Sequence, residues 1–341
     1  MKITLVTGSY PPDVCGVGDY TARVVSSDTA AGWTLYYRKD WGLRRLGRIL
    51  REIGATRSDT VILEHPTQGY GWNLTPHLLT LALGWFSRRK MVVRLHEYTQ
   101  LSAKSRAAVT LMLLAADGVI FTNDRDREAA CRRFARLRRR SAVVKIFTNI
   151  GISGTLKPVD ERSISLVNFG HIRPGKGLER FLELVARLRR EGFTDEKIVL
   201  IGQVPAGYES YWEGLRPQAE RAGVAVELNA SGDRVAEVLN DSRIALLPFP
   251  DGASERRGSM LAAMANGAAV VSSKGAFTTP ELGQALTLAD ADRCFDAVKE
   301  LLLSPARTQE RQRAAQDFLV GQMPHSWDDV ARGYLRFVER L

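Results

Sequence analysis

The sequence is poor in cysteine and histidine, with 3 Cys and 5 His among 341 residues. The three cysteines, Cys15, Cys131 and Cys294, are odd in number and widely separated along the chain. This pattern predicts neither a disulfide framework nor a zinc site. So few cysteines are typical of a protein that works in a reducing cytoplasm.

Long apolar runs are also lacking. The most apolar segment, LTPHLLTLALGWF, contains Pro76 and His77 and is too short to cross a bilayer. The first residues, MKITLVTGSYPP, form a strand pattern without the charged start and apolar centre of a signal peptide. We therefore expect a cytoplasmic protein, and any membrane contact should be peripheral, at the inner face.

Acidic residues are scarce in the first half of the chain. Residues 1–150 hold 24 basic and 12 acidic side chains, whereas residues 151–341 hold 24 and 26. The net charge of +10 therefore comes entirely from the first half. Arginine dominates this excess, in the stretches WGLRRLGRILRE and DRDREAACRRFARLRRR.

The stretch WGLRRLGRILRE predicts a basic amphipathic helix. One helical face carries Leu43, Leu46 and Leu50, and the opposite face carries Arg44, Arg48 and Arg51. A surface helix packed on its own core is the favoured interpretation, and a contact with an anionic membrane is the alternative. Nucleic acid would also suit a basic face, but we expect none, because no aromatic stacking platform, zinc spacing or helix-turn-helix pattern accompanies it.

Short β-branched runs alternate with helix-length segments throughout the chain. The first half contains ITLVTG, WTLYY, TVILEH, MVVRLH, GVIFTN and AVVKIF; after the connection IGISGTLKPVDERS, the second half contains ISLVNFG, KIVLIG, VAVELN, RIALLP and AAVVSS. Such alternation is typical of βα units and parallel sheets. We expect an α/β protein with two Rossmann-like, doubly wound domains, 1–152 and 153–324, facing each other across a cleft.

Polar or glycine-rich loops follow four of these strands, where ligands bind in open α/β sheets. They are GSYPPDVCGVGDY, the loop that begins with His96, GHIRPGKG, and DGASERRGSM. Arg173 and Lys176 stand at the start of one predicted helix. At the start of another stand Gly258 and Ser259, with Arg256 or Arg257 adding charge. Free N–H groups at helix N-termini bind phosphate, so the sequence predicts two anion sites on one sheet.

Each of these features also has a purely structural interpretation. The glycine-rich loop could be a solvated basic turn, the second helix could simply be tightly packed, and His96 could be a satisfied core side chain. The position of His96 at a strand end favours a functional role. Glu64 and Glu97 also lie at strand ends, but nothing in the sequence shows that carboxylates converge there.

Over nearly its whole length, the chain resembles the retaining glycosyltransferases of family four, which have the GT-B fold. YPPDVCGVGDYTARVV resembles their N-terminal glycine loop, with Gly16 and Gly18 at the turn, and VVRLHEY matches the segment that bears their active-site histidine, here His96. FTNIGI resembles their Pro-Asn-Gly connection, with Thr148 in place of proline. HSWDDVARGYLRFVERL resembles the terminal helix that crosses back over the first domain, at about 325–341.

The second half carries the resemblance further. FGHIRPGKGLERFLEL resembles the Gly-Arg-Leu-x-Pro-x-Lys-Gly phosphate loop: Lys176 falls on the family lysine, His171 occupies the arginine position, and we expect Arg173 to replace that arginine. LIGQVPAGYESYWEGL resembles the strand and loop beside the nucleotide base. DGASERRGSMLAAMANG matches the paired-glutamate region, but Ala262 replaces the second glutamate and Glu255 lies one residue from the first.

The resemblance implies a hexosyltransferase that moves a sugar from a nucleotide diphosphate to a saccharide or lipid-linked acceptor hydroxyl, with retention at the anomeric carbon. Polysaccharide or glycoconjugate biosynthesis is the setting, and neither a cofactor nor a metal is expected. The implied catalytic residues are His96, Arg173, Lys176 and Glu255. The implied donor-binding residues are Gly16, Gly18, Gly170, Gly202, Arg257, Gly258, Ser259 and Met260, and the acceptor side has Asp19 and Tyr20.

Other interpretations remain open. Asp-x-Asp pairs at Asp124–Asp126 and Asp290–Asp292 could suggest magnesium, but aspartates at these places are expected to cap helices. A nucleotide-sugar epimerase would need a placed acid and base. A nicotinamide enzyme is disfavoured because no strand-associated G-x-G-x-x-G with a downstream carboxylate appears. A non-catalytic relative that binds nucleotide or a partner is credible because of Ala262.

Overall fold

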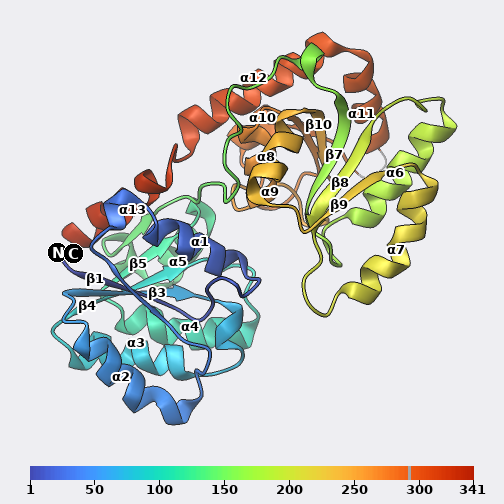
Figure 1. The fold of residues 1–341 in the computed structure, drawn as a ribbon. Helices are drawn as coiled ribbons and strands as arrows, with labels where there is room; N and C mark the ends of the chain where they lie inside the picture. Colours follow the sequence, from blue (N-terminus) through green and yellow to red (C-terminus); the bar gives the residue numbers. More distant parts are fainter. Residues whose placement is uncertain (291–292) are drawn as a thin grey trace. The chain divides into compact units, whose positions relative to one another are not determined.

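The computed structural model describes residues 1–290 and 293–341. It contains two compact units, Met1–Ile146 with Pro324–Leu341, and Phe147–Met323. Each unit is built on one six-stranded parallel sheet covered by helices (Figure 1). The expected α/β class with two doubly wound domains is therefore confirmed. The first unit ends at Ile146, six residues before the boundary expected from the sequence.

The sheet of the first unit has the strand order β2-β1-β3-β4-β5-β6. Its strands are β1 (Ile3–Thr7), β2 (Thr34–Tyr37), β3 (Thr60–His65), β4 (Lys90–Leu95), β5 (Gly118–Phe121) and β6 (Ser141–Val143). Its helices are α1 (Gly16–Val25), α2 (Leu46–Ala55), α3 (Thr75–Phe86), α4 (Ala103–Ala115), α5 (Asp124–Arg133) and α13 (Trp327–Glu339). Short 3-10 turns are η1 (Asp28–Ala30), η2 (Leu43–Arg45), η3 (Gln68–Tyr70) and η4 (Ala135–Arg138). Every strand of this sheet overlaps one of the predicted β-branched runs, although β6 shares only residues 142–143 with the run AVVKIF.

Strand side chains of the first unit alternate between two helix layers. Val61 and Leu63 of β3 face α2 to α5 and belong to a core of 22 buried residues. Glu64 points to the opposite face, where it meets Tyr334 of α13. The last helix packs closely there, because Gly333 lets the helix backbone approach Val144 and an added Cβ would lie 3.0 Å from that side chain. The end of the chain therefore completes the first unit.

The sheet of the second unit has the order β12-β11-β10-β7-β8-β9. Its strands are β7 (Ile164–His171), β8 (Ile198–Gln203), β9 (Ala225–Leu228), β10 (Ser242–Leu247), β11 (Ala269–Ser272) and β12 (Thr287–Leu288). Its helices are α6 (Leu178–Arg190), α7 (Glu209–Arg221), α8 (Gly232–Asn240), α9 (Gly258–Ala265), α10 (Pro280–Ala285), α11 (Cys294–Leu303) and α12 (Pro305–Gln322), and η5 (Val159–Glu161) is a 3-10 turn. The two-residue strand β12 was not predicted.

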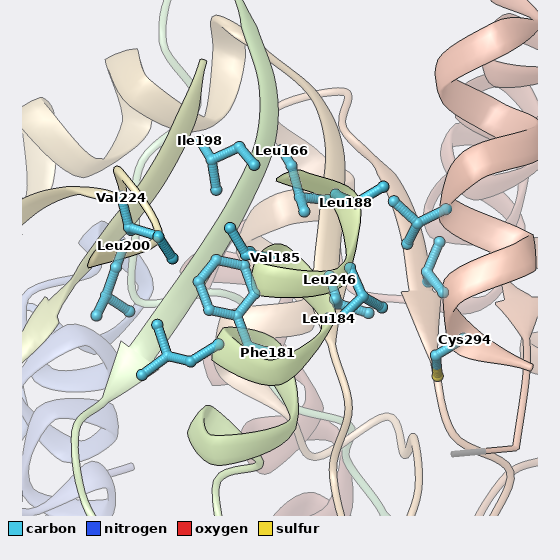
Figure 2. Packing of buried hydrophobic residues seen from close by; sticks show 14 of the residues in the cluster. Leu166, Phe181, Leu184, Val185, Leu188, Ile198, Leu200, Val224, Leu246 and Cys294 are labelled. Atoms are coloured by element: carbon cyan, nitrogen blue, oxygen red, sulfur yellow. The ribbon is translucent and has the colours of Figure 1, made fainter. Parts of the chain in front are cut away.

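One core cluster of the second unit centres on α6. Phe181, Val185 and Leu188 of this helix point at the sheet, where they meet Leu166, Leu200 and other apolar residues (Figure 2). All three helix residues are fully buried. The spacing of four and three residues explains this face, because it keeps them on one side of a 3.6-residue turn. This packing fixes the start of α6, which carries candidate site residues.

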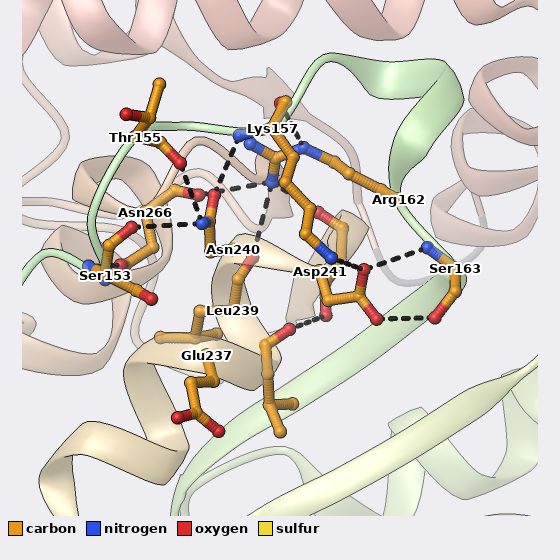
Figure 3. A network of polar contacts seen from close by, with 12 residues as sticks. Ser153, Thr155, Lys157, Arg162, Ser163, Glu237, Leu239, Asn240, Asp241 and Asn266 are labelled. Atoms are coloured by element: carbon orange, nitrogen blue, oxygen red, sulfur yellow. Dashed lines mark hydrogen bonds and ion pairs between the residues drawn. The ribbon is translucent and has the colours of Figure 1, made fainter.

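The connection after Ile146 is fastened to the second unit by polar contacts (Figure 3). The side-chain amide of Asn240 donates to the carbonyls of Ser153 and Thr155, at 3.0 and 3.1 Å. Arg162 is buried and donates from Nη1 to the carbonyl of Ser242 at 2.9 Å. These bonds satisfy the backbone of an irregular segment, which is why the connection belongs to this unit.

The predicted basic helix differs from the structure at its start. Leu43–Arg45 form the 3-10 turn η2, and α2 begins at Leu46. The buried side is made by Ile49 and Ile53, whereas Leu43 is 57% exposed. The helical wheel misplaced Leu43 because a 3-10 turn advances by 120° per residue instead of 100°.

The first Asp-x-Asp pair begins helix α5, as predicted, but neither aspartate is the capping residue. The cap of α5 is Asn123, whose side chain accepts a hydrogen bond from the N–H of Asp126. Asp126 is buried, and its Oδ1 accepts from the N–H and hydroxyl of Thr99 at 2.9 and 2.6 Å. Tertiary contacts, which spacing alone does not show, decided the role of this carboxylate. In the second pair, Asp292 lies outside the described residues.

Two searches cover residues 1–290 and 293–341. In this part of the chain, no three His, Cys, Asp or Glu residues are grouped in a way that could hold a metal ion. Within the same ranges, no helix has both the length and the apolar character needed to cross a bilayer.

Candidate functional site

In the second unit, the predicted anion sites lie side by side at the carboxyl edge of the sheet. Strands β7 and β10 are parallel neighbours, and each is followed by a loop and then by α6 or α9. A Cβ placed on Gly170, in β7, would lie 3.8 Å from the hydroxyl of Ser259, in the first turn of α9. An added Cβ on Gly202 would lie 2.1 Å from the carbonyl oxygen of Gly170, so position 202 has room only for glycine.

Both helices begin without a side-chain cap. The N-caps are Gly177 for α6 and Arg257 for α9, and neither makes a side-chain capping hydrogen bond. Gly177 has φ of 78°, and an added Cβ would lie 2.1 Å from the carbonyl oxygen of Pro248. Only glycine fits this turn, which therefore brings the two loops together. The N–H groups of the first helical turns remain suited to an anion.

Cationic side chains gather around these helix starts. Burial, followed by the positive charges of Arg257 and Arg173, lowers the pKa of Lys176 to about 8. Burial and the same kind of repulsion, from Lys176 and Arg173, lower the pKa of His171. The mutual influence places Arg173 in the cluster with Lys176 and Arg257, while the shifted His171 is favoured in its neutral form. A half-buried set of like charges is expected to gain stability when an anion binds.

Arg257 is held in place by its neighbours. Its guanidinium pairs with the carboxylate of Asp251 and lies over the ring of Phe249, with the central carbon 4.5 Å from the ring centroid. Burial lowers the pKa of Arg257, and the negative charge of Asp251 opposes this shift. The guanidinium of the adjacent Arg256 lies over the ring of Phe277, with the central carbon 4.4 Å from the ring centroid.

The other residues predicted in this region have distinct environments. Glu255 is 91% buried, and the hydroxyl of Thr279 lies 3.4 Å from its Oε1. The side chains of Met260 and Ala262 are fully buried, so Met260 can offer only its backbone N–H to a ligand. Gly258 has open space where a Cβ would be, so close approach of backbone to ligand is unobstructed there.

In the first unit, His96 pairs with a buried carboxylate. Its Nε2 lies 2.5 Å from Oε2 of Glu64, which is fully buried at the end of the neighbouring strand. Because the carboxylate accepts, Nε2 donates, and in the neutral ring Nδ1 then carries the lone pair. The backbone N–H of His96 also donates to the carbonyl of His65 at 2.8 Å. The ring and the backbone of His96 are thus both held in place.

The carboxylate of Glu64 is shared with the last helix. Tyr334 donates its hydroxyl hydrogen to Oε1 of Glu64 at 2.8 Å. Since that proton is used, the hydroxyl of Tyr20, at 3.0 Å, must be the donor to Tyr334. The guanidinium of Arg94 lies 5.4 Å from the ring centroids of both tyrosines. Burial raises the pKa of Tyr20 to about 12, so this chain of hydroxyls stays protonated at neutral pH.

The glycine loop of the first unit lies next to this network. The ring of Tyr20 packs edge-on against His96, with centroids 5.2 Å apart, so loop and histidine are in contact. Gly18 lies close to the chain at Ser9, where an added Cβ would be 3.0 Å from the carbonyl oxygen. Gly16 has no such neighbour. Burial raises the pKa of Asp19 despite the nearby Arg23.

The sequence did not predict the pairing of His96 with Glu64 or the participation of Arg94 and Tyr334. A usable sign was present: Glu64 and Arg94 are charged residues near the ends of otherwise apolar, buried strands. Such charges require partners, but the partner from α13 comes from 270 residues away in sequence. A second unpredicted feature is His65, whose pKa burial lowers to about 3, so it is neutral.

The chain was compared with known protein families, curated sequences and solved structures. The family described as "Glycosyl transferases group 1" matches residues 163–304. No curated protein sequence matches the chain. HepE (Alr3699) of Anabaena in complex with UDP superposes with a TM-score of 0.75 at 14% identity, over 100% of both chains.

Two further structures are similar over almost their whole length. Sucrose-phosphate synthase of Thermosynechococcus elongatus gives a TM-score of 0.71 at 14% identity, over 100% of this chain and 98% of the other. The α,α-trehalose-phosphate synthase (UDP-forming) of Burkholderia vietnamiensis gives 0.67 at 14%, over 98% and 96%. At such identities the likeness establishes the fold, and the fold is GT-B, with two Rossmann-like units.

Proposed function

We propose that the chain is a retaining glycosyltransferase that moves a hexose from a nucleotide diphosphate to an acceptor hydroxyl. The observation that carries this proposal is the cation cluster of Arg173, Lys176 and Arg257 beside two uncapped helix N-termini. A diphosphate supplies two adjacent anionic groups, which is what two neighbouring helix starts with charged side chains would bind. The family match over residues 163–304 covers this region.

The resemblance to the retaining enzymes of family four implies the course of the reaction. The bond between the anomeric carbon and the diphosphate oxygen breaks, and a bond from the same carbon to the acceptor oxygen forms on the same face. The acceptor proton passes to the departing phosphate oxygen, so a nucleoside diphosphate leaves. Charge that builds on this diphosphate would be stabilised by Lys176, Arg173 and the N–H groups near Ser259. Such cations can do the work of a metal ion, and we expect activity to persist in a chelator.

The remaining roles come from the resemblance to family four. His96 would orient the sugar, with Glu64 holding its ring, and Glu255 would bind sugar hydroxyls. The acceptor is expected on the basic first unit, where a lipid-linked or anionic saccharide suits the charge. Polysaccharide or glycoconjugate synthesis is then the setting. The exposed Arg44 and Arg51 of the η2–α2 segment would favour an anionic membrane surface.

The decisive experiment is calorimetric titration with UDP, GDP, ADP and dTDP and their sugars. Two of the similar structures contain UDP or are described as UDP-forming, so UDP is the first choice. Lys176→Ala should weaken binding at least tenfold. Its control is Lys197→Ala, because Lys197 is exposed and precedes β8 at the opposite edge of the sheet. Equal affinity of wild type and Lys176→Ala would refute the site.

A second candidate is a non-catalytic protein that binds nucleotide. It is favoured by Ala262, which is fully buried and replaces a glutamate of the resembled motif. Nucleotide binding without hydrolysis or transfer of any donor sugar would support it. Product formation from a bound donor with an acceptor mixture would exclude it, and turnover without acceptor would instead indicate an epimerase.

A further inference from the structure

The α3–α4 side of the first unit carries an exposed apolar surface that the proposed reaction does not use. We define it as the α3–α4 face: Trp72, Leu74, Trp85, Phe86, Leu111 and Leu114. Their exposed fractions run from 37% for Leu114 to 96% for Trp72. We propose that this face inserts into an anionic lipid bilayer and anchors the protein on the membrane.

Helix α3 has no polar outer side. Its sequence, TPHLLTLALGWF, contains no charged residue, and its inner side packs through Leu79 and Leu83. The outward row continues from Leu74 to Trp85, which are 59% and 56% exposed. A surface helix of a protein that stays in water normally presents charges there, so an apolar outer row indicates a non-aqueous contact.

Helix α4 extends the surface. Gly84 of α3 packs on the end of α4, where an added Cβ would lie 2.1 Å from the carbonyl oxygen of Ala115. This contact brings the exposed Trp85 near the end of α4 that carries Leu111 and Leu114. α3 and α4 lie next to each other on the same side of the sheet, with α2 beyond them (Figure 1). The exposed apolar side chains of the face therefore lie on two adjacent helices and on the residues just before α3.

The charges around the face are mostly positive. Between residues 65 and 116, the only acidic residue is Glu97. Exposed cations stand at both helices, with Arg88 just after α3 and Lys104 in the first turn of α4. At the end of α4, Arg136 donates to the carbonyl of Leu113 at 3.0 Å, which keeps its positive charge beside the leucines.

Helix α2 adds further positive charge at the edge of the face. Arg89 joins the ends of α3 and α2, because its guanidinium donates to the carbonyls of Ile53 and Gly54, both at 2.7 Å. Arg51 of α2 and Arg44 of η2 are both exposed. Neither makes an ion pair within the part of the chain that the structure describes. Apolar side chains surrounded by free cations match a bilayer with anionic headgroups.

A second copy of the chain fits this face less well. Pairing two such surfaces would bring Arg88 and Lys104 of each copy toward the like charges of the other, without acidic partners on α3 or α4. Tryptophan and phenylalanine beside arginine are instead the side chains that favour the interface between headgroups and acyl chains. The bilayer is therefore the occupant that satisfies both the apolar area and the charge.

The inference deepens the proposed function. It rests on that function only for the purpose of the membrane contact, which would be access to a lipid-linked acceptor. The binding itself needs no glycosyl transfer. It is measured by lipid flotation, whereas the proposed function is measured by nucleotide titration. Failure of one is thus distinguishable from failure of the other.

The test uses the full chain with vesicles of phosphatidylcholine, alone or with 30–40% phosphatidylglycerol (roughly the charge density that attracts basic segments). Wild type should float with the anionic vesicles, and Trp85→Gln/Phe86→Gln should bind them at least tenfold more weakly. The matched control is Leu303→Gln/Val320→Gln, which removes two equally exposed apolar side chains from the second unit. This control should bind lipid as wild type does.

Unchanged thermal unfolding and UDP titration of the Trp85/Phe86 variant would show that its fold is intact. The proposal would be overturned if the wild-type protein floated with neither kind of vesicle, or if the Trp85/Phe86 variant floated with the anionic vesicles as wild type does. It would also be overturned if sedimentation showed a wild-type dimer that the variant splits, without vesicle binding, because the face would then join two copies.

Discussion

Lys176 is placed where its charge costs the free protein stability. Burial and the neighbouring arginines lower its pKa from 10.5 to about 8. Below pH 8 the ammonium is charged in both folded and unfolded chains, so the full penalty is present. Between pH 8 and 10.5 only the unfolded chain holds the proton, and stability rises with pH. A residue retained at such a cost is expected to serve a ligand.

The first prediction concerns Lys176→Met, which keeps the length of the side chain but removes its charge. We expect the free protein to become more stable by about 1–3 kcal/mol at pH 7, with the gain shrinking as pH rises from 8 to 10.5. UDP affinity should fall at the same time. Chemical unfolding at several pH values measures the first effect. A variant less stable than wild type at pH 7 would show that Lys176 is structural.

The second prediction concerns Glu64, whose carboxylate pairs with His96. Tyr334→Phe removes the hydroxyl that donates to Glu64 and accepts from Tyr20, and should destabilise the first unit by about 1–3 kcal/mol. If Glu64 positions His96, Glu64→Gln should lower kcat more than it raises KM, because the amide can hold the ring but cannot offset charge on it. Turnover of the donor identified by titration measures this.

The conservative variant Glu64→Asp provides the contrast for that experiment. It retains the charge but shortens the reach to His96, so partial recovery of kcat relative to Glu64→Gln would indicate that charge matters. Identical kinetics for wild type and Glu64→Gln, with changed stability alone, would leave Glu64 a structural residue only. NMR of the His96 ring nitrogens adds a readout of the tautomer that is independent of activity.

At the scale of elements, the turn before α6 sets the geometry of the anion site. The third prediction compares two glycines in that turn with nearly equal φ, Gly177 at 78° and Gly175 at 79°. An added Cβ meets nothing within 4 Å at Gly175, but lies 2.1 Å from Pro248 at Gly177. Gly175→Ala should cost about 1–2 kcal/mol, the cost of the left-handed backbone alone.

Gly177→Ala should cost clearly more and should also weaken UDP binding, because the loops after β7 and β10 must separate. Thermal unfolding and titration of both variants check this. If the two alanine variants bound UDP equally well, the close contact between Gly177 and Pro248 would not be needed for nucleotide binding.

The elements that the sequence predicted well are those that a local pattern determines. Buried parallel strands such as β3 and β4 are continuous apolar runs, so their positions were predictable. The start of α2 was not, because the turn η2 has a different period. The pair of Glu64 and His96 was not predictable either, since it depends on which strands are neighbours. Glycine-rich helix starts were predictable because their residue types are restricted by the backbone itself.

At the scale of the whole molecule, the chain divides its chemistry between two units. The first unit carries the net positive charge, the His96 network and the α3–α4 face, while the second carries the anion site. The first unit is discontinuous, because residues 324–341 return to it after the second is complete. Tyr334, Phe337 and Val338 of α13 are buried there, so the first unit depends on the end of the chain.

The fourth prediction follows from this dependence. Deleting residues 324–341 should expose the apolar surface under α13 and leave Glu64 buried without its tyrosine donor. The first unit should then unfold at lower temperature, whereas the second should keep its transition and its stabilisation by UDP, since Lys176 and Arg257 lie within it. Calorimetric scans with and without UDP check this. Loss of UDP stabilisation together with the helix would mean that the nucleotide needs the first unit, and the anion cluster alone would then be insufficient to bind it.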